Sequence, residues 1–539
     1  MDKLKVVTDV VYSIEGVTVT SAFKEEGEVI VGSAVFSVDN VSLDFHIRIL
    51  SAYPLQLHDS ESIRFINTNL LQYNHVNADG SICVNTHHST NIKEKLIFDF
   101  SSLKEWIRRY YINGAKDNHY EHIIVPHDDR AVFLFTSIDR TFLKGDFGSI
   151  TYSKLAVGFK KEQKIETLIV QQFRIGRSVY DCKWNSVYKN LEKREGLFVF
   201  VDEAPTRNRR FAVSSWAELE PYVSQDFLKF LNLNSRSRHT ESVIPLLIGY
   251  KIPNDEVHWQ CVVVPSRNFP NYAEKIPGTT NYVGRLADEE MQWVSTRNCS
   301  YEYFFGRGSF VQEITNGKIL VIGIGAIGSN VATTLTRGGC RGIALIDYDI
   351  KEPENVCRAE YTFSTGINSK INELSDHLTQ ISPFVEVSLS DHFMDIAKVS
   401  LNNDTWRTTL FQKLEEYDII FDCSTDDDVA YILDQLKHPK RIFTMSITNN
   451  AKELICAVPP KLYKWMIDIT RQLETKDNYL YNPNGCWNPT FKASYNDIAV
   501  LVQFAIKHIT TSIANNLSPR SFYLTTSMED GFNIKLKEF

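Results

Sequence analysis

The sequence predicts a multidomain α/β protein, with a small α+β domain first, an α/β or β-rich spacer next, and a doubly wound α/β domain last. Three observations lead to this fold class. The chain has 539 residues, which is too long for a single core. Its opening residues alternate between apolar and polar in short runs. Its last part alternates strand-like with helix-like segments.

The first predicted domain covers residues 1–125. Two alternating stretches, VIVGSAVFSV and LDFHIRIL, predict strands. They are followed by SSLKEWIRRYY, in which apolar residues recur at helical spacing from Leu103 to Tyr110. Ser101 or Ser102 suits the N-cap of that helix. This order predicts a small α+β unit.

The second predicted domain covers residues 126–288. The runs AVFLFTSI, LFVFV and WQCVVVP are typical of strands, and SQDFLKFLNLN is typical of a helix. None of these segments carries a recognisable chemical motif. We therefore expect this part to be a structural spacer.

The third predicted domain covers residues 289–539. Its first strand, KILVIGIG, is apolar almost throughout, as expected when helices cover both faces of a parallel sheet. The segment SNVATTLTRGG follows as a helix that ends on glycines, and IALIDYD, DIIFDCS and RIFTMSI are further strands. This alternation predicts a Rossmann-like, doubly wound domain.

Charge and hydropathy exclude several classes of protein. The net charge of -8 argues against a nucleic-acid partner, because a phosphate-binding surface usually brings an excess of basic residues. The N-terminal stretch MDKLKVVTDVVYSIEG has no long apolar run after its lysines, so we expect no signal peptide. Because no uninterrupted apolar run reaches roughly 18 residues, we also expect no membrane span.

The cysteines indicate a reducing compartment. There are nine of them, an odd number, scattered along the chain without a C-x-x-C pair. This pattern argues against a disulfide framework and against a structural zinc site. We therefore expect a cytoplasmic protein with free thiols.

A glycine-rich turn joins the first strand of the third domain to its first helix. The turn reads GIGAIG, with glycines at Gly323, Gly325 and Gly328. Such glycines allow a tight turn, bring backbone N–H groups close to phosphate and leave a helix N-terminus facing the anion. Asp347, at the end of the next strand, suits a hydrogen bond from a ribose hydroxyl. Together they predict a nucleotide site.

The residues after Asp347 distinguish between classes of nucleotide enzyme. The stretch DYDIKEPENVCRAEYTFSTGINSK contains Asp349, Asn355, Arg358 and Lys370, a polar series that a nicotinamide-dependent oxidoreductase has no reason to carry. The series resembles the ThiF and ubiquitin-activating adenylyltransferase family, whose pattern is D-x-D, then N-x-x-R, then a glycine and a lysine. The resemblance implies that the nucleotide is ATP.

The chemistry of adenylation fits these residue types. A carboxylate attacks the α-phosphorus of ATP and pyrophosphate leaves, so negative charge on three phosphates must be neutralised while two anions approach. In this interpretation Arg358 and Lys370 hold the triphosphate, and Asn355 orients the phosphates.

Two further features of that family have counterparts in this chain. The stretch FDCSTDDD resembles the family's strand-end aspartate motif, which implies that Asp426 positions Mg2+. The resemblance also implies an arginine from upstream of the glycine turn, often supplied by a dimer partner. Both Arg297 and Arg307 are candidates for that arginine, and ThiF-like domains usually form homodimers.

Cys486 is a candidate acceptor for the activated acyl group. It lies in the stretch YNPNGCWNPTF, a loop-like segment before a helical pattern, where an exposed thiol can reach a second substrate. The stretch resembles the C-terminal segment of bacterial ubiquitin-activating-like fusion enzymes, in which this cysteine accepts the acyl group as a thioester.

Cys83 is a candidate for a second thioester. The stretch NHVNADGSICVNT resembles the active-site segment of ubiquitin-conjugating enzymes, where a glycine turn leads through isoleucine to the thioester cysteine. Those enzymes usually have His-Pro-Asn, with the asparagine eight residues before the cysteine. Here His75 occupies that position and Asn77 lies two residues nearer. Either side chain could donate a hydrogen bond to the oxyanion that forms when an amine attacks the thioester.

The order of these parts resembles the fused activating and conjugating enzymes of bacterial CBASS-type antiphage operons. The resemblance spans the first 125 residues and residues 317–491. It implies adenylation of a protein C-terminus, thioester formation on Cys486, transfer to Cys83 and ligation to a lysine or other amine. The protein substrate would be a ubiquitin-like protein or the CD-NTase of the operon, which makes a cyclic oligonucleotide signal.

Three other functions compete with this interpretation. A sulfur-carrier adenylyltransferase of the ThiF or MoeB type shares the nucleotide site but needs no conjugating-like domain. A nicotinamide-dependent oxidoreductase is opposed by the series Asn355, Arg358 and Lys370. A non-enzymatic Rossmann scaffold is opposed by the intact glycines and acids.

Overall fold

The computed structural model describes residues 2–57, 60–84, 86–115, 123–160, 162–184, 186–207, 210–235, 243–252, 256–390, 403–436, 441–473, 492–529 and 531–539. The chain forms two compact units. The first comprises Met1–Leu134, Arg140–Tyr180 and Lys193–Arg297, and the second comprises Phe135–Asp139, Asp181–Glu192 and Asn298–Phe539. The division at residues 125 and 288 stays a prediction.

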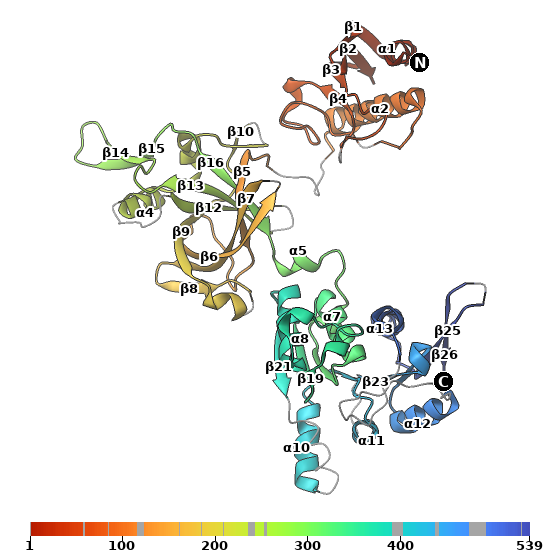
Figure 1. Cartoon of the computed structure of the whole chain (residues 1–539). Helices are drawn as coiled ribbons and strands as arrows, with labels where there is room; N and C mark the ends of the chain where they lie inside the picture. Colours follow the sequence, from red (N-terminus) through yellow and green to blue (C-terminus); the bar gives the residue numbers. More distant parts are fainter. Residues whose placement is uncertain are drawn as a thin grey trace. The chain divides into compact units, whose positions relative to one another are not determined.

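The first unit begins with a four-stranded antiparallel sheet in the order β1-β2-β3-β4. Its strands and the two helices around it are α1 (Lys3–Ser13), β1 (Val17–Glu26), β2 (Val29–Val38), β3 (Val41–Ile49), β4 (Ile63–Ile66) and α2 (Ile92–Trp106). Both helices share one apolar core with the sheet (Figure 1). At its centre Phe100 of α2 stacks on Phe36 of β2 at 5.3 Å and meets Phe65 of β4 edge-on at 5.2 Å.

The alternating patterns predicted β2 and β3 correctly, but the expected start of the following helix was wrong. Helix α2 begins at Ile92, and its N-cap is Asn91, whose side chain accepts from the backbone N–H of Lys93 and Glu94. The serines at positions 101 and 102 therefore lie inside the helix. A cap that satisfies two backbone donors outweighs the low helix propensity of two serines in its interior.

The central part of the first unit is built on an eight-stranded sheet in the order β5-β16-β13-β12-β9-β6-β7-β8. A further pairing of β5 with β7 closes seven of these strands into a ring. These strands are β5 (His127–Phe135), β6 (Phe147–Lys160), β7 (Gln163–Ile175), β8 (Ser178–Asp181), β9 (Lys193–Phe200), β12 (Val243–Lys251), β13 (Val257–Pro265) and β16 (Gln292–Asn298).

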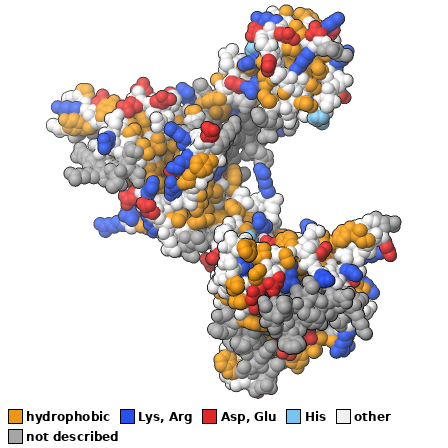
Figure 2. Space-filling model, in the orientation of Figure 1, with side chains coloured by type: hydrophobic (Ala, Val, Ile, Leu, Met, Phe, Trp, Pro, Cys, Tyr) orange, Lys and Arg blue, Asp and Glu red, His pale blue; other side chains and the backbone are white. Residues whose placement is uncertain are grey.

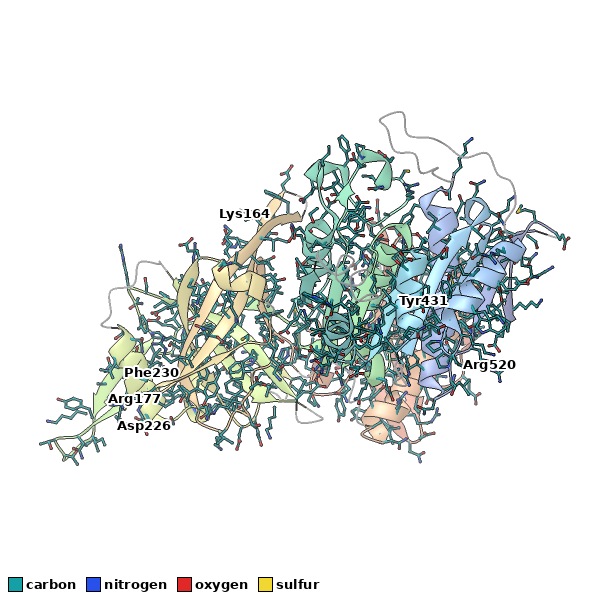
Figure 3. The ribbon with its side chains drawn as sticks, turned by 90° about the horizontal axis from the view of Figure 1, so that it is seen from below. Lys164, Arg177, Asp226, Phe230, Tyr431 and Arg520 are labelled. Atoms are coloured by element: carbon teal, nitrogen blue, oxygen red, sulfur yellow. The ribbon has the colours of Figure 1, made fainter. Side chains whose placement is uncertain are left out.

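Smaller elements pack around this ring. They are β10 (Thr206–Arg207), β11 (Phe211–Ala212), α3 (Trp216–Leu219), α4 (Gln225–Ser235), β14 (Asn271–Lys275) and β15 (Tyr282–Leu286). Helix α4, which the sequence predicts, contributes buried Phe227, and its Phe230 lies 5.2 Å from Phe147 of β6 (Figure 3). The apolar interior of the ring is filled by aromatic residues, among them Phe173 and Trp259, 5.0 Å apart.

The second unit has an eight-stranded sheet in the order β21-β18-β17-β22-β23-β24-β25-β26. The five strands from β21 to β23 run parallel, and the last three are antiparallel. These strands are β17 (Lys318–Ile322), β18 (Gly342–Ile346), β21 (Glu386–Ser390), β22 (Ile419–Asp422), β23 (Arg441–Thr448), β24 (Glu453–Ala457), β25 (Phe522–Ser527) and β26 (Asn533–Glu538). The parallel part confirms the doubly wound prediction.

Helices cover both faces of this sheet, because its strands are apolar on both sides. On β17, Ile319 and Val321 face the core beneath α7, α8 and α13, whereas Leu320 and Ile322 face the core beneath α10, α11 and α12. Tyr431 of α11 meets Tyr463 of α12 edge-on at 5.4 Å (Figure 3). The helices of this unit are α5 (Tyr301–Phe305), α6 (Gln312–Thr315), α7 (Ala326–Arg337), α8 (Lys370–Ile381), α10 (Asp404–Leu414), α11 (Asp427–Asp434), α12 (Leu462–Leu473) and α13 (Tyr495–Ala514).

Helix α13 is the one described helix that is long and apolar enough to cross a membrane by length and composition alone. Its position in the fold gives a different reason for this composition. Residues Ile498, Leu501, Ile506 and Ile509 are buried in the core shared with α7 and the sheet. The helix is apolar because it covers one face of the sheet.

Charges of both signs are mixed on the surface. Figure 2 shows lysine and arginine side chains interspersed with aspartate, glutamate and hydrophobic side chains on the face drawn. This mixture accords with 58 basic and 66 acidic residues in the whole sequence.

Candidate active site

A cavity of about 350 Å³ opens at the carboxyl ends of the parallel strands in the second unit. The chain runs from β17 to β18 on one side, whereas β22 pairs with β17 on the other, so the strand order reverses here. Such a reversal leaves a crevice in which doubly wound proteins bind ligands. The cavity is lined by Gly323, Gly325, Ala326, Ile327, Ile346, Asp347, Tyr348, Asp349, Asn355, Arg358, Ala359, Tyr361, Lys370, Cys423, Ser424, Thr425, Asp426 and Ile447.

Close backbone packing requires glycine at two of the three glycine positions in this turn. Gly323 has φ +73°, and a Cβ there would lie 2.4 Å from the Cα of Ser424. A Cβ on Gly328 would lie 2.0 Å from the carbonyl oxygen of Gly323. Gly325 differs, because a Cβ there would meet no protein atom within 4 Å. Gly325 lines the cavity, so its missing side chain leaves room there.

Asp347 fastens the turn to the end of β18. One carboxylate oxygen accepts from the backbone N–H of Ile324 at 2.9 Å, and the other accepts from that of Asp349 at 2.8 Å. The acid thus holds two loops at the cavity edge. Each carboxylate oxygen has more than one acceptor site, so this geometry leaves capacity for a ribose hydroxyl as well.

Lys370 is held at the cavity wall by Asp349. Its ammonium nitrogen lies 2.6 Å from Asp349 Oδ2, and its backbone N–H donates to the Asp349 carbonyl at 3.2 Å. Lys370 is buried, with 8% of its surface exposed. A buried cation aimed at a cavity by a carboxylate suits an anionic ligand.

Asn355 and Arg358 come from the segment between β19 (Ile350–Lys351) and β20 (Asn368–Ser369). The Asn355 side chain accepts from the backbone N–H of Glu352 at 2.9 Å, which caps a short turn. The backbone N–H of Arg358 donates to the Asn355 carbonyl at 3.2 Å. The turn therefore delivers both side chains to the same cavity.

Asp426 is the N-cap of α11 and also lines the cavity. Its Oδ1 accepts from the backbone N–H of Asp428 at 2.9 Å. Nearby, Asp422 is fully buried at the end of β22, and this burial raises its pKa to about 6. Ser424 donates to Asp422 through its hydroxyl at 2.6 Å.

The structure adds cavity residues that the sequence patterns did not single out. Tyr361 donates its hydroxyl hydrogen to the carbonyl of Ile324, and burial raises the pKa of that phenol well above its usual range. Ser424, Thr425 and Tyr348 line the cavity beside it. Ser424 and Thr425 lie within the FDCSTDDD motif, so their position after β22 was an available signal. Tyr361 lies in an irregular segment and carried none.

Among the nucleotide-site residues expected between Gly323 and Asp426, all but one line this cavity. Gly328 is the exception, because it packs against the turn instead. Neither candidate arginine from upstream, Arg297 or Arg307, is among the described residues that line the cavity.

The first unit has a separate cavity, of about 700 Å³, beside Cys83. The cavity is lined by Gln56, Ser60, Glu61, Ile63, Arg64, Asn77, Ala78, Asp79, Ser81, Ile82, Cys83 and Val84. Cys83 is an exposed free cysteine. Partial burial of its thiol in the cavity raises the pKa of Cys83.

The two candidate oxyanion donors differ in position. The His75 carbonyl accepts from the backbone N–H of Cys83 at 2.7 Å, and the His75 ring lies 4.7 Å from that of Tyr110. His75 has φ +61° and does not line the cavity. Asn77 lines the cavity together with Cys83, and its Nδ2 donates to Ser81 Oγ at 3.0 Å.

Cys486, the candidate acceptor of the activated acyl group, lies outside the described residues. The described chain resumes after it at residue 492, where the backbone N–H of Lys492 donates to the Asn450 side chain at 2.8 Å. Helix α13 then begins at Tyr495, whose backbone N–H donates to the carbonyl of Cys357 at 2.9 Å. Cys357 is one residue from Arg358, so the start of α13 contacts the segment that carries Arg358.

Comparison with known proteins identifies the family of the part of the chain that forms the nucleotide cavity. The model of the ThiF family matches residues 297–446. The ATP-dependent ubiquitin transferase-like protein Cap2 of Enterobacter hormaechei is 25% identical over 378 residues, which cover 64% of this chain and 61% of the relative. Ubiquitin-like modifier-activating enzyme 5 of Drosophila willistoni is 29% identical over 146 residues, 26% of this chain and 35% of the relative.

The chain thus spans less than two thirds of the length of these relatives. A crystal structure of E. coli MccB with ATP aligns at 15% identity and a TM-score of 0.30, covering 42% of this chain and 65% of that one. Residues 297–446 of this chain form a ThiF family domain, and this stretch contains Asp347, Asn355, Arg358 and Lys370.

Proposed function

We propose that this protein is an ATP-dependent adenylyltransferase that activates the C-terminal carboxylate of another protein and passes it on as a thioester. The observation that carries the proposal is the cavity of the ThiF family domain. There Asn355, Arg358 and Lys370 meet the glycine turn and Asp426. A site for inorganic phosphate alone would not need the ribose acid, Asp347.

The charges around the cavity suit attack by a carboxylate on the α-phosphorus of ATP. Lys370 and Arg358 provide positive charge for the phosphates, and the backbone N–H groups at the start of α7 face the same space. As the carboxylate oxygen bonds to phosphorus, the bond to pyrophosphate breaks. Each preorganised donor of this kind is worth about 3–4 kcal/mol of transition-state stabilisation.

The residues present also fit Mg2+. Among the described residues no group of three or more His, Cys, Asp and Glu side chains could hold a metal ion. Proteins usually hold Mg2+ through one or two carboxylates together with substrate phosphates. Asp426 would supply the carboxylate, and bound Mg2+ would neutralise phosphate charge.

We further propose a relay through two cysteines. The Cys486 thiolate attacks the acyl-adenylate carbonyl and AMP leaves, which gives a thioester. The Cys83 thiolate then attacks that thioester and releases Cys486. Finally a lysine or other amine attacks the Cys83 thioester, forming an amide and releasing Cys83. The likeness to the ubiquitin transferase-like protein Cap2, which extends beyond the ThiF family domain, supports this relay.

The cavity beside Cys83 supports a role in the last step. Asn77 is the better placed of the two oxyanion donors, because it lines the same cavity as Cys83. This assignment replaces His75 in the proposed mechanism and leaves the histidine as a backbone partner of Cys83. The first domain would then resemble ubiquitin-conjugating enzymes in its function as well as in its active-site motif.

The biological setting belongs to the same proposal. The activated protein would be the CD-NTase of an antiphage operon or a ubiquitin-like protein, and the acceptor an amine of another molecule. The enzyme would act in the cytoplasm as a homodimer. These assignments rest on the motif resemblance and on the similarity to the Enterobacter protein Cap2.

One experiment tests the activity and the relay together. The full chain is expressed in its own host with its neighbouring genes, and adducts sensitive to dithiothreitol are resolved on non-reducing gels and sequenced by mass spectrometry. We expect one protein attached through its C-terminus, and no adduct in Arg358→Ala. Cys83→Ala should accumulate the Cys486 adduct, whereas Cys486→Ala should abolish both. An adduct that persists in Arg358→Ala would contradict adenylation.

A further inference from the structure

A buried ion pair lies outside the lining of the nucleotide cavity, within the ThiF family domain. Lys351 ends β19 with 2% of its surface exposed, and Glu373 lies in the first turn of α8 with 5% exposed. The Lys351 ammonium nitrogen is 2.7 Å from Glu373 Oε2. A fully buried lysine must find partners for its charge and its three donors, so its contacts indicate what it holds.

The contacts of the pair converge on one segment. Lys351 donates to the Thr362 carbonyl at 2.6 Å and to the Thr365 hydroxyl. Glu373 accepts from the Thr362 backbone N–H at 3.0 Å and from the Thr365 hydroxyl at 2.7 Å. The three donors of the ammonium group are thereby used on Thr362, Thr365 and Glu373. Both charges are satisfied by the same short stretch, residues 362–365.

This network joins three pieces of chain that carry cavity residues. Lys351 follows Asp349 by two residues at the end of β19. Thr362 and Thr365 lie on the segment that returns from Arg358. Glu373 is one helical turn after Lys370 in α8. The pair therefore holds together the two ends of the segment 351–373, which carries Arg358 and Lys370 to the cavity.

We infer that Lys351 and Glu373 are positioning residues that fix residues 351–373 so that Arg358 and Lys370 face the phosphates of ATP. The inference rests on the proposed function. Buried ion pairs often add little net stability compared with apolar residues, because removing two charges from water offsets their attraction. A directional network that fixes a loop is a use that apolar residues would not supply.

The decisive measurement is the affinity for ATP with Mg2+, determined by calorimetry on the full chain. Lys351→Met leaves Glu373 buried without its cation and removes the shorter of the two hydrogen bonds that the Thr362 carbonyl accepts. We expect ATP binding to weaken on the order of tenfold or more, since small displacements of binding groups have effects of this size. Lys318→Met, which removes an exposed lysine at the start of β17, is the matched control and should leave the affinity unchanged.

The double variant Lys351→Met with Glu373→Met separates positioning from general stability. It leaves no charge unpaired, so its melting temperature should return close to that of the unchanged protein. It cannot restore the hydrogen bonds to Thr362 and Thr365, so its ATP affinity should stay low. If ATP affinity returns together with the melting temperature, the pair serves only stability and the inference fails.

Hydrogen exchange distinguishes failure of this inference from failure of the proposed function. If the unchanged protein does not bind ATP with Mg2+, the proposed function is wrong. In that case hydrogen exchange of the backbone amides in residues 352–366 still tests whether the Lys351–Glu373 pair fixes this segment. Faster exchange in both variants than in the unchanged protein and Lys318→Met supports it. Equal exchange in all four proteins overturns it.

Discussion

Gly325 and Gly328 belong to one turn, yet the structure requires them for different reasons. A Cβ at Gly328 would lie 2.0 Å from the Gly323 carbonyl oxygen, whereas a Cβ at Gly325 would meet no protein atom within 4 Å. Gly328→Ala should therefore lower both the melting temperature and ATP affinity. Gly325→Ala should lower ATP affinity only, because its methyl group would enter the cavity. Calorimetry and thermal unfolding measure both quantities, and equal melting temperatures for the two variants would contradict this account.

Asp422 gives stability a specific dependence on pH. Burial raises its folded pKa to about 6, above the ordinary value of 3.8 for an aspartate, so the folded state binds a proton more tightly than the unfolded state. This contribution is present below the unfolded pKa and is lost as pH rises through about 6. When fully present, it adds about 3 kcal/mol to the free energy of unfolding.

Replacement of Asp422 by asparagine should remove that dependence. The variant keeps a polar side chain of similar size and cannot ionise. The decline in stability between pH 4 and pH 7 should be smaller in Asp422→Asn than in the unchanged protein, as measured by urea unfolding at several pH values. An identical decline in both proteins would show that Asp422 is not responsible.

Asn77 and His75 can be separated by the last step of the proposed relay. Asn77→Ala should slow discharge of a Cys83 thioester to free lysine on the order of 10²-fold, because an oxyanion donor is lost. His75→Ala should slow it much less, since the His75 contact to Cys83 is made by its backbone carbonyl. Single-turnover discharge followed on non-reducing gels measures both rates. The reverse order would restore His75 as the donor.

Helix α2 carries a cation that the fold of the first unit needs. Lys95 is buried, and its ammonium group donates to Glu61 Oε2 at 2.7 Å and also contacts Asp99 and Thr86. Glu61 lines the cavity of Cys83, and Thr86 follows Cys83 by three residues. The network therefore links α2 to both sides of the thiol site.

Loss of that cation should destabilise the first unit. Lys95→Met leaves Glu61 and Asp99 buried without a partner charge, which costs about 3–5 kcal/mol. Lys93→Met, on an exposed position of the same helix, is the control and should change stability little. Urea unfolding of the full chain, followed by hydrogen exchange in α2, measures the difference. A loss below about 1 kcal/mol in Lys95→Met would contradict the assigned role of the network.

The sequence predicted the buried strands, whose side chains face an apolar core on each side of the sheet. It did not predict features that depend on contacts made only in the folded chain. The strands β17 and β18 were predictable because every residue after the first is apolar or small. The start of α2 was missed because the hydrogen bonds of Asn91 outweigh the pattern near Ser101. The order and spacing of the motifs predicted that the glycine turn, Arg358 and Lys370 lie at one site. The Lys351–Glu373 pair could not be predicted, since a charged residue reveals its burial only in the folded chain.

Assembly of the chain is tested through the arginine that the proposed ATP site would take from a partner. A homodimer should behave as a particle of twice the 61.9 kDa chain mass in light scattering. Arg358→Ala, inactive alone, is mixed and refolded with Arg307→Ala, and separately with Arg297→Ala. One mixture should recover about a quarter of the activity of the unchanged protein, because half the dimers contain both variants and each of these has one intact site out of two. No recovery in either mixture would contradict sharing of sites.

The position of α13 late in the chain has a consequence for biosynthesis. Ribosomes deliver the strands and helices from β17 to α12 before α13 emerges, although α13 covers part of one apolar face of the sheet with Leu501, Ile506 and Ile509. During that interval the nascent domain exposes the surface on which α13 will pack. Such an intermediate is a substrate for chaperones, and its apolar surface stays uncovered until translation has passed Ala514.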